Sequence, residues 1–178
     1  VEIFCQIDGV FQGAARMTGH QVGHKILLFA GLLAQLIELV LEFVCDEPMN
    51  LAGNYDSIKT RMRICPLNEG GKEARTEFKR LEFFKDINAS LLLVRPLTGR
   101  QHQIRLHLFH MKHRILGEPL YGLEKTDIEA ILDKKMSVDD RITITGAKRL
   151  CLHSHRLAFE FEGEKFDIIS QKDIKTEF

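Results

Sequence analysis

RPLTGRQHQIRLHLFHMKHRILGEPLYG, residues 95–122, gathers charged and polar side chains around the expected start of a helix. Residues 101–112 contain neither glycine nor proline, and Ile104, Leu108 and Met111 recur at the spacing of one helix face. The free N–H groups at a helix start attract anions, and guanidinium groups bind oxyanions in a planar fork. The stretch therefore predicts a turn followed by an amphipathic helix, with a place for a phosphate or a carboxylate.

Strands are expected on both sides of this helix. Residues 73–84 and 89–94 are rich in β-compatible residues and are joined by a short polar turn, which predicts an antiparallel hairpin. Three further strands are expected near the end of the chain, over residues 149–153, 156–161 and 166–170. Together with irregularly placed helices, these strands predict an α+β domain with a mainly antiparallel mixed sheet and flanking helices.

The remaining segments are expected to be helical or irregular. Residues 126–136 predict a short helix with Thr126 as its N-cap, and residues 50–71 and 137–148 predict exposed polar loops. Residues 26–44 are almost entirely apolar and long enough to cross a bilayer. Their polar residues Gln35, Glu38 and Glu42 fall on one stripe, which favours a buried amphipathic helix over a membrane span.

Composition indicates a globular protein of 178 residues, most simply one domain, with 25 basic and 25 acidic side chains and a net charge of zero. With no net charge the protein as a whole does not attract a nucleic-acid backbone, so any nucleic-acid site must come from local clustering of basic side chains. The four cysteines are widely separated, which predicts reduced thiols and a cytoplasmic location. Four histidines lie close together in residues 102–113, but their spacing does not suit zinc, and no metal is expected.

The quoted stretch resembles a motif of the ribosomal large-subunit pseudouridine synthase A family, P-x-T-G-R-x-H-Q-[IL]-R-x-H followed by H-x-I-x-G-D-x-x-Y-G. Every specified position of the first half is matched, and Glu118 and Arg114 replace the usual Asp and Pro of the second half. Residues 149–161 are similar to the family's R-L-x-L-H-A-x-x-L-x-F strand pair, and residues 45–48 and 70–78 resemble the segment before the hairpin. The resemblance covers about residues 45–170.

This resemblance implies one catalytic domain over residues 1–178, with residues 1–44 divergent or incomplete. It implies an enzyme that isomerises uridine to pseudouridine in ribosomal or transfer RNA, as a monomer, without metal, cofactor or membrane. Arg105 is expected to pair with the catalytic carboxylate. The residues expected to bind RNA are Thr98, Arg100, Gln101, His102, Gln103 and His107.

The family's nucleophile motif, H-R-L-D-x-x-T-S-G, is not found in this sequence, and three alignments compete. Asp8 follows an aliphatic residue and precedes Gly13, which makes it the preferred nucleophile. In a second alignment His20 occupies the catalytic position and the chemistry is lost, and in a third the nucleophile lies before Val1. The strand that carries the family's active-site tyrosine is not recognisable either. The alternative function is therefore an RNA-binding protein that has lost its catalytic aspartate.

Overall fold

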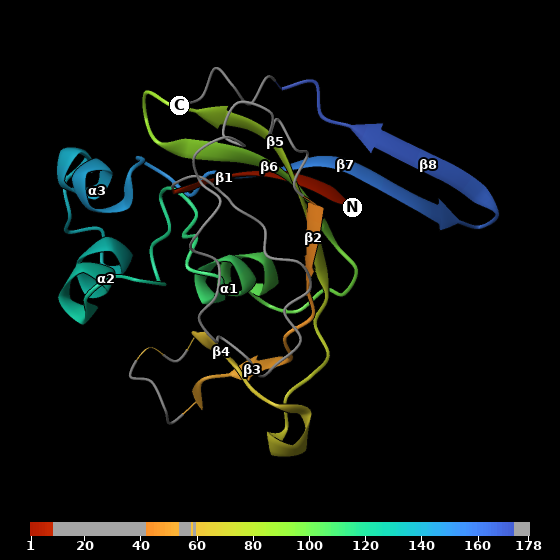
Figure 1. The fold of residues 1–178 in the computed structure, drawn as a ribbon, viewed down its shortest axis with the longest axis horizontal. Coiled ribbons are helices and arrows are strands. Elements are labelled where there is room, and N and C mark those ends of the chain that lie inside the picture. The colour runs from red at the N-terminus through yellow and green to blue at the C-terminus, as the bar shows by residue number, and fades with distance from the viewer. Residues whose placement is uncertain (9–41, 54–57, 59, 173–178) are drawn as a thin grey trace, which may run out of the picture.

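A six-stranded sheet forms the framework of this computed structural model, which describes residues 1–8, 42–53, 58 and 60–172 (Figure 1). The strand order is β2-β5-β6-β1-β7-β8, and every neighbouring pair is antiparallel. The strands are β1 (Glu2–Asp8), β2 (Glu42–Cys45), β5 (Thr76–Phe84), β6 (Ala89–Pro96), β7 (Leu152–Phe161) and β8 (Glu164–Ile169). The α+β class predicted from the sequence is confirmed.

The β5–β6 hairpin occupies the middle of the sheet, as its sequence predicts. Thr76 pairs with Pro96 at one end and Phe84 with Ala89 at the other, and a register shift falls between Arg80 and Glu82. β6 is buried over most of its length because β1 and β5 flank it and a helix covers it. Hydrophobic side chains at these positions therefore anchor the sheet to the rest of the molecule.

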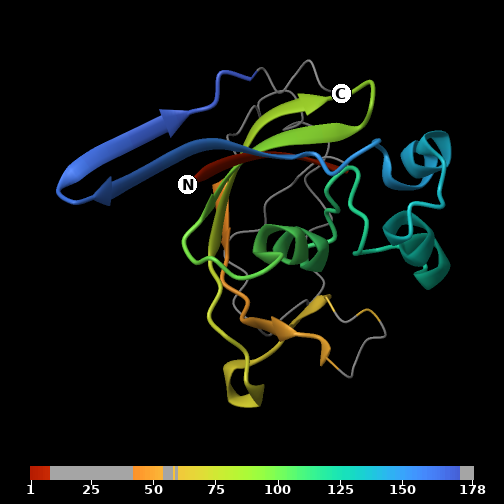
Figure 2. The ribbon, with the colours of Figure 1, turned by 180° about the vertical axis from the view of Figure 1, so that it is seen from behind.

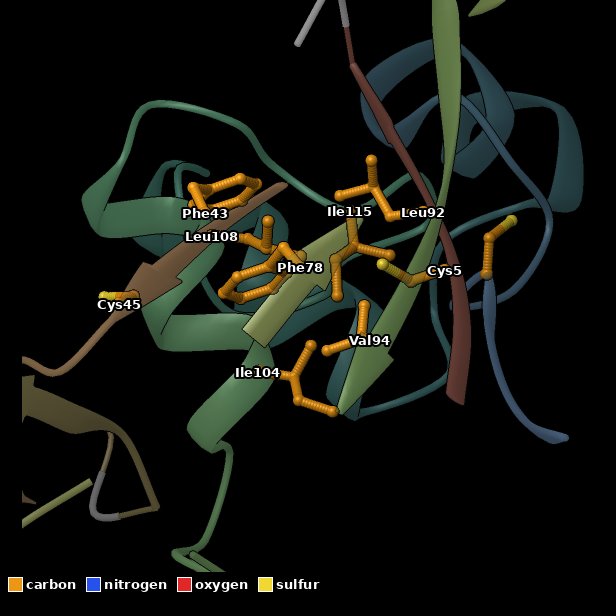
Figure 3. Packing of buried hydrophobic residues seen from close by; sticks show 10 residues of the cluster. Cys5, Phe43, Cys45, Phe78, Leu92, Val94, Ile104, Leu108 and Ile115 are labelled. Carbon is orange, nitrogen blue, oxygen red and sulfur yellow. The ribbon is translucent and has the colours of Figure 1, made fainter. Parts of the chain in front are cut away.

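Helix α1 (Gln103–His110) lies against one face of the sheet, and both ribbon views place it below β5 and β6 (Figures 1 and 2). Ile104 and Leu108 point into the core and Met111 packs at its edge, as the helical spacing predicts. They meet a stacked pair, Phe43 and Phe78, whose ring centroids are 4.7 Å apart (Figure 3). The core cluster comprises Cys5, Phe43, Cys45, Phe78, Leu92, Val94, Ile104, Leu108, Ile115 and Cys151.

A second, smaller cluster lies on the other side of α1. The strands β3 (Met49–Leu51) and β4 (Met62–Ile64) form a two-stranded sheet, followed by the 3-10 helix Leu67–Glu69. Met49, Leu106 and Tyr121 are buried here together with Ala74, Leu120 and Ile128. Helix α1 is therefore packed between the large sheet and the small one, so its polar residues Gln103 and His107 are buried.

Several expectations from the sequence need correction. Residues 42–44 belong to strand β2 rather than to the end of a helix, while residues 26–41 lie outside the described residues. The expected loop over residues 50–71 contains β4 and part of β3. No helix among the described residues is long and apolar enough to cross a membrane.

The helices after the quoted stretch also differ from expectation. Helix α2 (Lys125–Leu132) begins after Glu124, so Thr126 lies inside it and is not its N-cap. Helix α3 (Val138–Thr145) replaces an expected loop, and its N-cap Ser137 accepts a hydrogen bond from the Asp140 N–H. Helix α3 was missed because five of its eight residues are β-branched, which lowers helix propensity, and its apolar residues Val138 and Ile142 are exposed and not part of the core.

Gly117 provides a test of how tightly this region is packed. A Cβ on Gly117 would lie 1.8 Å from the Arg149 carbonyl oxygen, and its φ of +75° belongs to the left-handed region. We expect Gly117→Ala to lower the free energy of unfolding by at least about 2 kcal/mol, measured by urea denaturation. Gly99→Ala is the matched control, because a Cβ there meets nothing within 4 Å. Equal stability of the two variants would contradict this packing.

Candidate active site

A buried ion pair joins Arg105 of α1 to Glu118 of the segment that follows the helix. Arg105 Nε donates to Glu118 Oε2 at 2.8 Å, and Nη2 donates to Oε1 at 2.6 Å. The side chains are 12% and 1% exposed, respectively. Oε1 also accepts from the Leu120 N–H at 2.8 Å and the Tyr121 N–H at 3.3 Å. The carboxylate is therefore held by four N–H groups and fixes the plane of the guanidinium.

One edge of the guanidinium stays available after this pairing. Arg105 Nη1 has no hydrogen-bond partner among the described residues, and it is not among the buried unpaired atoms. An arginine carries five N–H donors, and the contact with Glu118 uses two of them. Arg105 thus presents an oriented, solvent-reachable donor group that can bind a second oxyanion, such as a carboxylate or a phosphate.

Tyr121 forms one wall of the same site. Its ring centroid lies 5.5 Å from the Arg105 guanidinium carbon and 5.6 Å from that of Arg61, within the range of cation–π contacts. The Tyr121 hydroxyl accepts from the Met62 N–H at 3.0 Å and lies 3.1 Å from His102 Nδ1. The tautomer of His102 decides which of these two groups donates, because the hydroxyl can accept a second hydrogen bond or donate its own proton.

Burial shifts both groups of the Tyr121–His102 contact toward their neutral forms. The pKa of Tyr121 is raised, chiefly because burial penalises the phenolate. The pKa of His102 is lowered by burial and by the nearby Arg105 guanidinium. His102 has a φ of 55° as the residue that precedes α1, a left-handed conformation that turns its ring toward Tyr121. The site therefore combines a fixed cation with a neutral phenol and a neutral imidazole.

A second polar network holds the turn before α1 against strand β5. Gln103 Oε1 accepts from Thr98 Oγ1 at 2.7 Å and from the Arg100 N–H at 3.0 Å. Gln103 Nε2 donates to the Arg75 carbonyl at 3.0 Å and to Thr76 Oγ1 at 2.9 Å. Every hydrogen-bonding atom of this buried amide is thus used within the protein, which assigns Gln103 to the support of the site.

His107 extends this network through the core. Its Nδ1 lies 2.9 Å from Thr76 Oγ1, and its Nε2 lies 3.0 Å from the Glu47 carbonyl oxygen. Because a carbonyl only accepts, Nε2 carries the proton and Nδ1 accepts from the threonine. Burial lowers the pKa of His107 to about 4, so the ring is neutral at pH 7. With no exposed surface, His107 holds β5, α1 and the segment after β2 together.

The predicted RNA-binding residues thus divide into an exposed and a buried set. Arg100 and Gln101 are exposed, and Arg100 Nε donates to the Glu73 carbonyl at 2.9 Å. Thr98 and His102 are half-buried, and Gln103 and His107 are buried. Within the described residues, no group of three or more His, Cys, Asp or Glu is arranged to hold a metal ion. The four cysteines are free, as predicted, and the structure shows that all four are buried.

Asp8 ends strand β1 opposite Ala89, and its side chain lies outside the described residues. Gln103, two residues before Arg105 on α1, donates to the Arg75 carbonyl and to Thr76, at the start of strand β5. Thr76 pairs with Pro96, which lies at the other end of β6 from Ala89. Ala89 and Pro96 are seven residues apart along β6, which corresponds to roughly 23 Å. The backbone thus places Asp8 and the start of α1 toward opposite ends of β6. His20 lies outside the described residues.

Sequence reasoning overlooked two members of the site. Glu118 was noted only as a replacement for an aspartate and Tyr121 only as a motif match, although both contact Arg105. A signal was present for Glu118, since a carboxylate enclosed by Gly117, Pro119 and Leu120 requires a buried cation or donors. The carboxylate that pairs with Arg105 thus lies in the same motif, at Glu118.

Comparison with known proteins agrees with this geometry. Residues 42–110 match the family model described as RNA pseudouridylate synthase. An uncharacterized RNA pseudouridine synthase from Helicobacter pylori (strain ATCC 700392 / 26695) is 37% identical over 126 residues, which cover 70% of this chain and 39% of the relative. The chain belongs to the RNA pseudouridine synthase family. The dual-specificity RNA pseudouridine synthase RluA of Escherichia coli (strain K12) is 30% identical over 105 residues, covering 59% of this chain and 42% of that protein.

A solved structure supports the fold of this pseudouridine synthase family member. Human RNA pseudouridylate synthase domain containing 1 superposes with a TM-score of 0.57 at 18% identity, covering 96% of this chain and 54% of that one. The matched part of this chain covers 39% of the length of the Helicobacter pylori relative. The family match ends at residue 110, before Glu118 and Tyr121, so the contacts of these two residues come from the geometry alone.

The buried ion pair makes a quantitative prediction. Glu118→Gln removes the charge partner of a mostly buried guanidinium, and we expect the free energy of unfolding to fall by about 3 kcal/mol. Glu129→Gln is the matched control, because the Glu129–Lys125 pair is exposed and its loss should cost less than about 0.5 kcal/mol. Chemical denaturation at pH 7 measures both. A Glu118→Gln chain as stable as the control would show that the pair contributes little to the fold.

His107 predicts how stability depends on pH. Burial gives the folded protein a His107 pKa of about 4, against 6.5 for an unperturbed histidine, so the folded state disfavours the charged ring. The stability that His107 contributes is complete above pH 6.5 and is lost as pH falls toward 4, on the order of 3 kcal/mol in all. We expect His107→Gln to reduce the stability difference between pH 7 and pH 4.5 in urea titrations. A variant that keeps the parent's full difference would contradict this role of His107.

Proposed function

We propose that this chain is an RNA pseudouridine synthase that isomerises uridine to pseudouridine in ribosomal or transfer RNA in the cytoplasm. In this reaction the bond between N1 and C1′ breaks, the uracil rotates, and C5 bonds to C1′. The C5 proton leaves and N1 gains a proton, so the reaction is an isomerisation that consumes no second substrate. The target base has to leave its stack to reach a protein carboxylate.

The observation that carries the proposal is the half-engaged guanidinium of Arg105. Glu118 fixes one edge of it, and Nη1 stays available for the catalytic carboxylate or for a phosphate of the flipped nucleotide. Glu118 does not serve as the nucleophile, because it is 1% exposed and both of its oxygens accept hydrogen bonds. Its role is to position Arg105. The exposed Arg100 and Gln101 and the half-exposed His102 are proposed to contact RNA beside it.

The role of Arg105 is tested by a substitution that keeps the positive charge and removes the planar guanidinium. Arg105→Lys should lower kcat/KM for pseudouridine formation by at least ~100-fold, because an ammonium does not reproduce the planar contacts. Product is measured by mass spectrometry after nuclease digestion of uridine-containing RNA. Arg156→Lys, at an exposed arginine of β7, is the matched control and should stay within about 2-fold of the parent. Equal activity of Arg105→Lys and the control would overturn the role of Arg105.

Asp8 is the candidate nucleophile from the sequence, but its backbone lies toward the opposite end of β6 from the start of α1. It is therefore tested independently of Arg105, and the competing alignments give different outcomes in the same assay. If Asp8 is the nucleophile, Asp8→Asn abolishes product, whereas Asp86→Asn, in the neighbouring hairpin turn, leaves it unchanged. If His20 occupies the catalytic position, the parent is inactive and His20→Asp gains activity. An active parent that is unaffected by Asp8→Asn would exclude Asp8.

A second function is favoured by one specific observation. The carboxylate that binds Arg105 is Glu118, and no other described carboxylate is bonded to it. A chain with this arginine site and no nucleophile would bind uridine-containing RNA without converting it. Fluorescence anisotropy with labelled RNA, run beside the product assay, separates the two: binding without product from the parent and from His20→Asp would favour the RNA-binding protein.

A further inference from the structure

The β7–β8 hairpin extends away from the body of the protein, as both ribbon views show (Figures 1 and 2). β8 is the outermost strand of the sheet and pairs only with β7 in the part of the chain that the structure describes. All six of its residues are exposed. An exposed outer strand presents unpaired N–H and C=O groups along its edge, which can pair with another strand.

One face of this hairpin is apolar. Leu157 pairs with Ile168 and Phe159 with Phe166, so their side chains share a face with Phe161. The rings of Phe159 and Phe166 stack at 5.0 Å with an interplanar angle of 14°. These residues stay 37–60% exposed, with Phe166 at the lower limit and Phe161 at the upper. Five large apolar side chains on one extended hairpin form a patch of the kind that marks an interaction surface.

The opposite face is charged and alternates in sign. Arg156 donates to both oxygens of Asp167 at 2.7 Å. Lys165 lies opposite Glu160 in the register. On this face of β8, the positive charge of Lys165 is therefore followed two residues later by the negative charge of Asp167. Phe166 lies between them on the other face.

This order is self-complementary. When two copies of β8 run antiparallel about a two-fold axis at Phe166, each Lys165 faces the other copy's Asp167, and the two Phe166 side chains face each other. Opposite charges and aromatic pairs at facing positions both stabilise antiparallel strands. We infer that β8 pairs with β8 of a second copy of this chain, in place of the monomer that the family resemblance implies, and that this pairing joins two six-stranded sheets into one continuous sheet.

The inferred pairing accounts for both faces of the hairpin together. On the apolar face, Phe159 and Phe166 of each copy line up as one row of four aromatic rings across the axis. On the other face, charges alternate from Glu160 through Lys165 to Asp167 of the second copy. A two-fold contact of this kind uses the same surface on both chains and closes without forming a filament.

Charge exchange between two variants tests this pairing directly. Lys165→Asp and Asp167→Lys should each weaken self-association by at least ~10-fold, since like charges then face each other in the homodimer. An equimolar mixture should associate again, because every introduced charge then faces an opposite one across the two-fold axis. Sedimentation velocity over a concentration series measures all four samples, with thermal unfolding as the test of folding.

The outcomes separate clearly. Dimers of the parent and of the mixture, with monomeric single variants, support the inference. A parent that stays monomeric at every concentration would mean that the edge charges keep β8 solvated, and the inference is then wrong. Single variants that dimerise as strongly as the parent, or a mixture that stays monomeric beside a dimeric parent, would overturn this register.

A disulfide cross-link locates the axis independently of charge. Facing residues of antiparallel strands have Cα atoms about 4.5–5.5 Å apart, which suits a disulfide. Phe166→Cys should therefore form a covalent dimer under mild oxidation. Phe161→Cys is the matched control, because three strand spacings, about 14 Å, separate the two β7 strands and no bond should form. A cross-link through the control alone would contradict the position of the axis.

Discussion

The ion pair between Arg105 and Glu118 connects the framework of this protein to its chemistry. It links the start of α1 to the segment after the helix, and Glu118 also binds the backbone of Leu120 and Tyr121. Removing two charges from water is costly, and here the cost is offset by a two-point contact and two further N–H donors. The result is a guanidinium that keeps one orientation before any substrate arrives, with Nη1 left unused.

The rest of the site depends on how firmly that helix is held. Gln103 and His107 lie on the same helix and bind Thr76 in the middle of the hydrogen-bonded network. Thr76 in turn belongs to the central hairpin of the large sheet. A site on rigid elements holds its geometry better than one on loops, so these buried polar residues stabilise the position of the helix that carries Arg105. The polar residues of this motif therefore form two groups. Some, such as Arg100, are exposed, whereas others, such as Gln103 and His107, are buried and hold the helix in place.

Much of the fold was accessible from the sequence because it depends on local patterns. The β5–β6 hairpin follows from alternation around a short turn, and α1 follows from Ile104, Leu108 and Met111. β2 was assigned to a helix because it continues an unbroken apolar run, and only pairing with β5 makes it a strand. The partner of Arg105 required tertiary information, since thirteen positions separate Arg105 from Glu118 in the chain. The motif resemblance identified the family but did not identify the carboxylate that pairs with Arg105.

The most direct test of this account follows the Arg105 guanidinium by nitrogen-resolved NMR while uridine-containing RNA is added. The account predicts that the Nη1 resonance shifts on binding, while Nε, bonded to Glu118, keeps its position. Arg156, paired with Asp167 on the hairpin, serves as the internal reference and should not respond. Unchanged Arg105 resonances at saturating RNA would place the RNA elsewhere and contradict the claim that this half-engaged arginine is the centre of the active site.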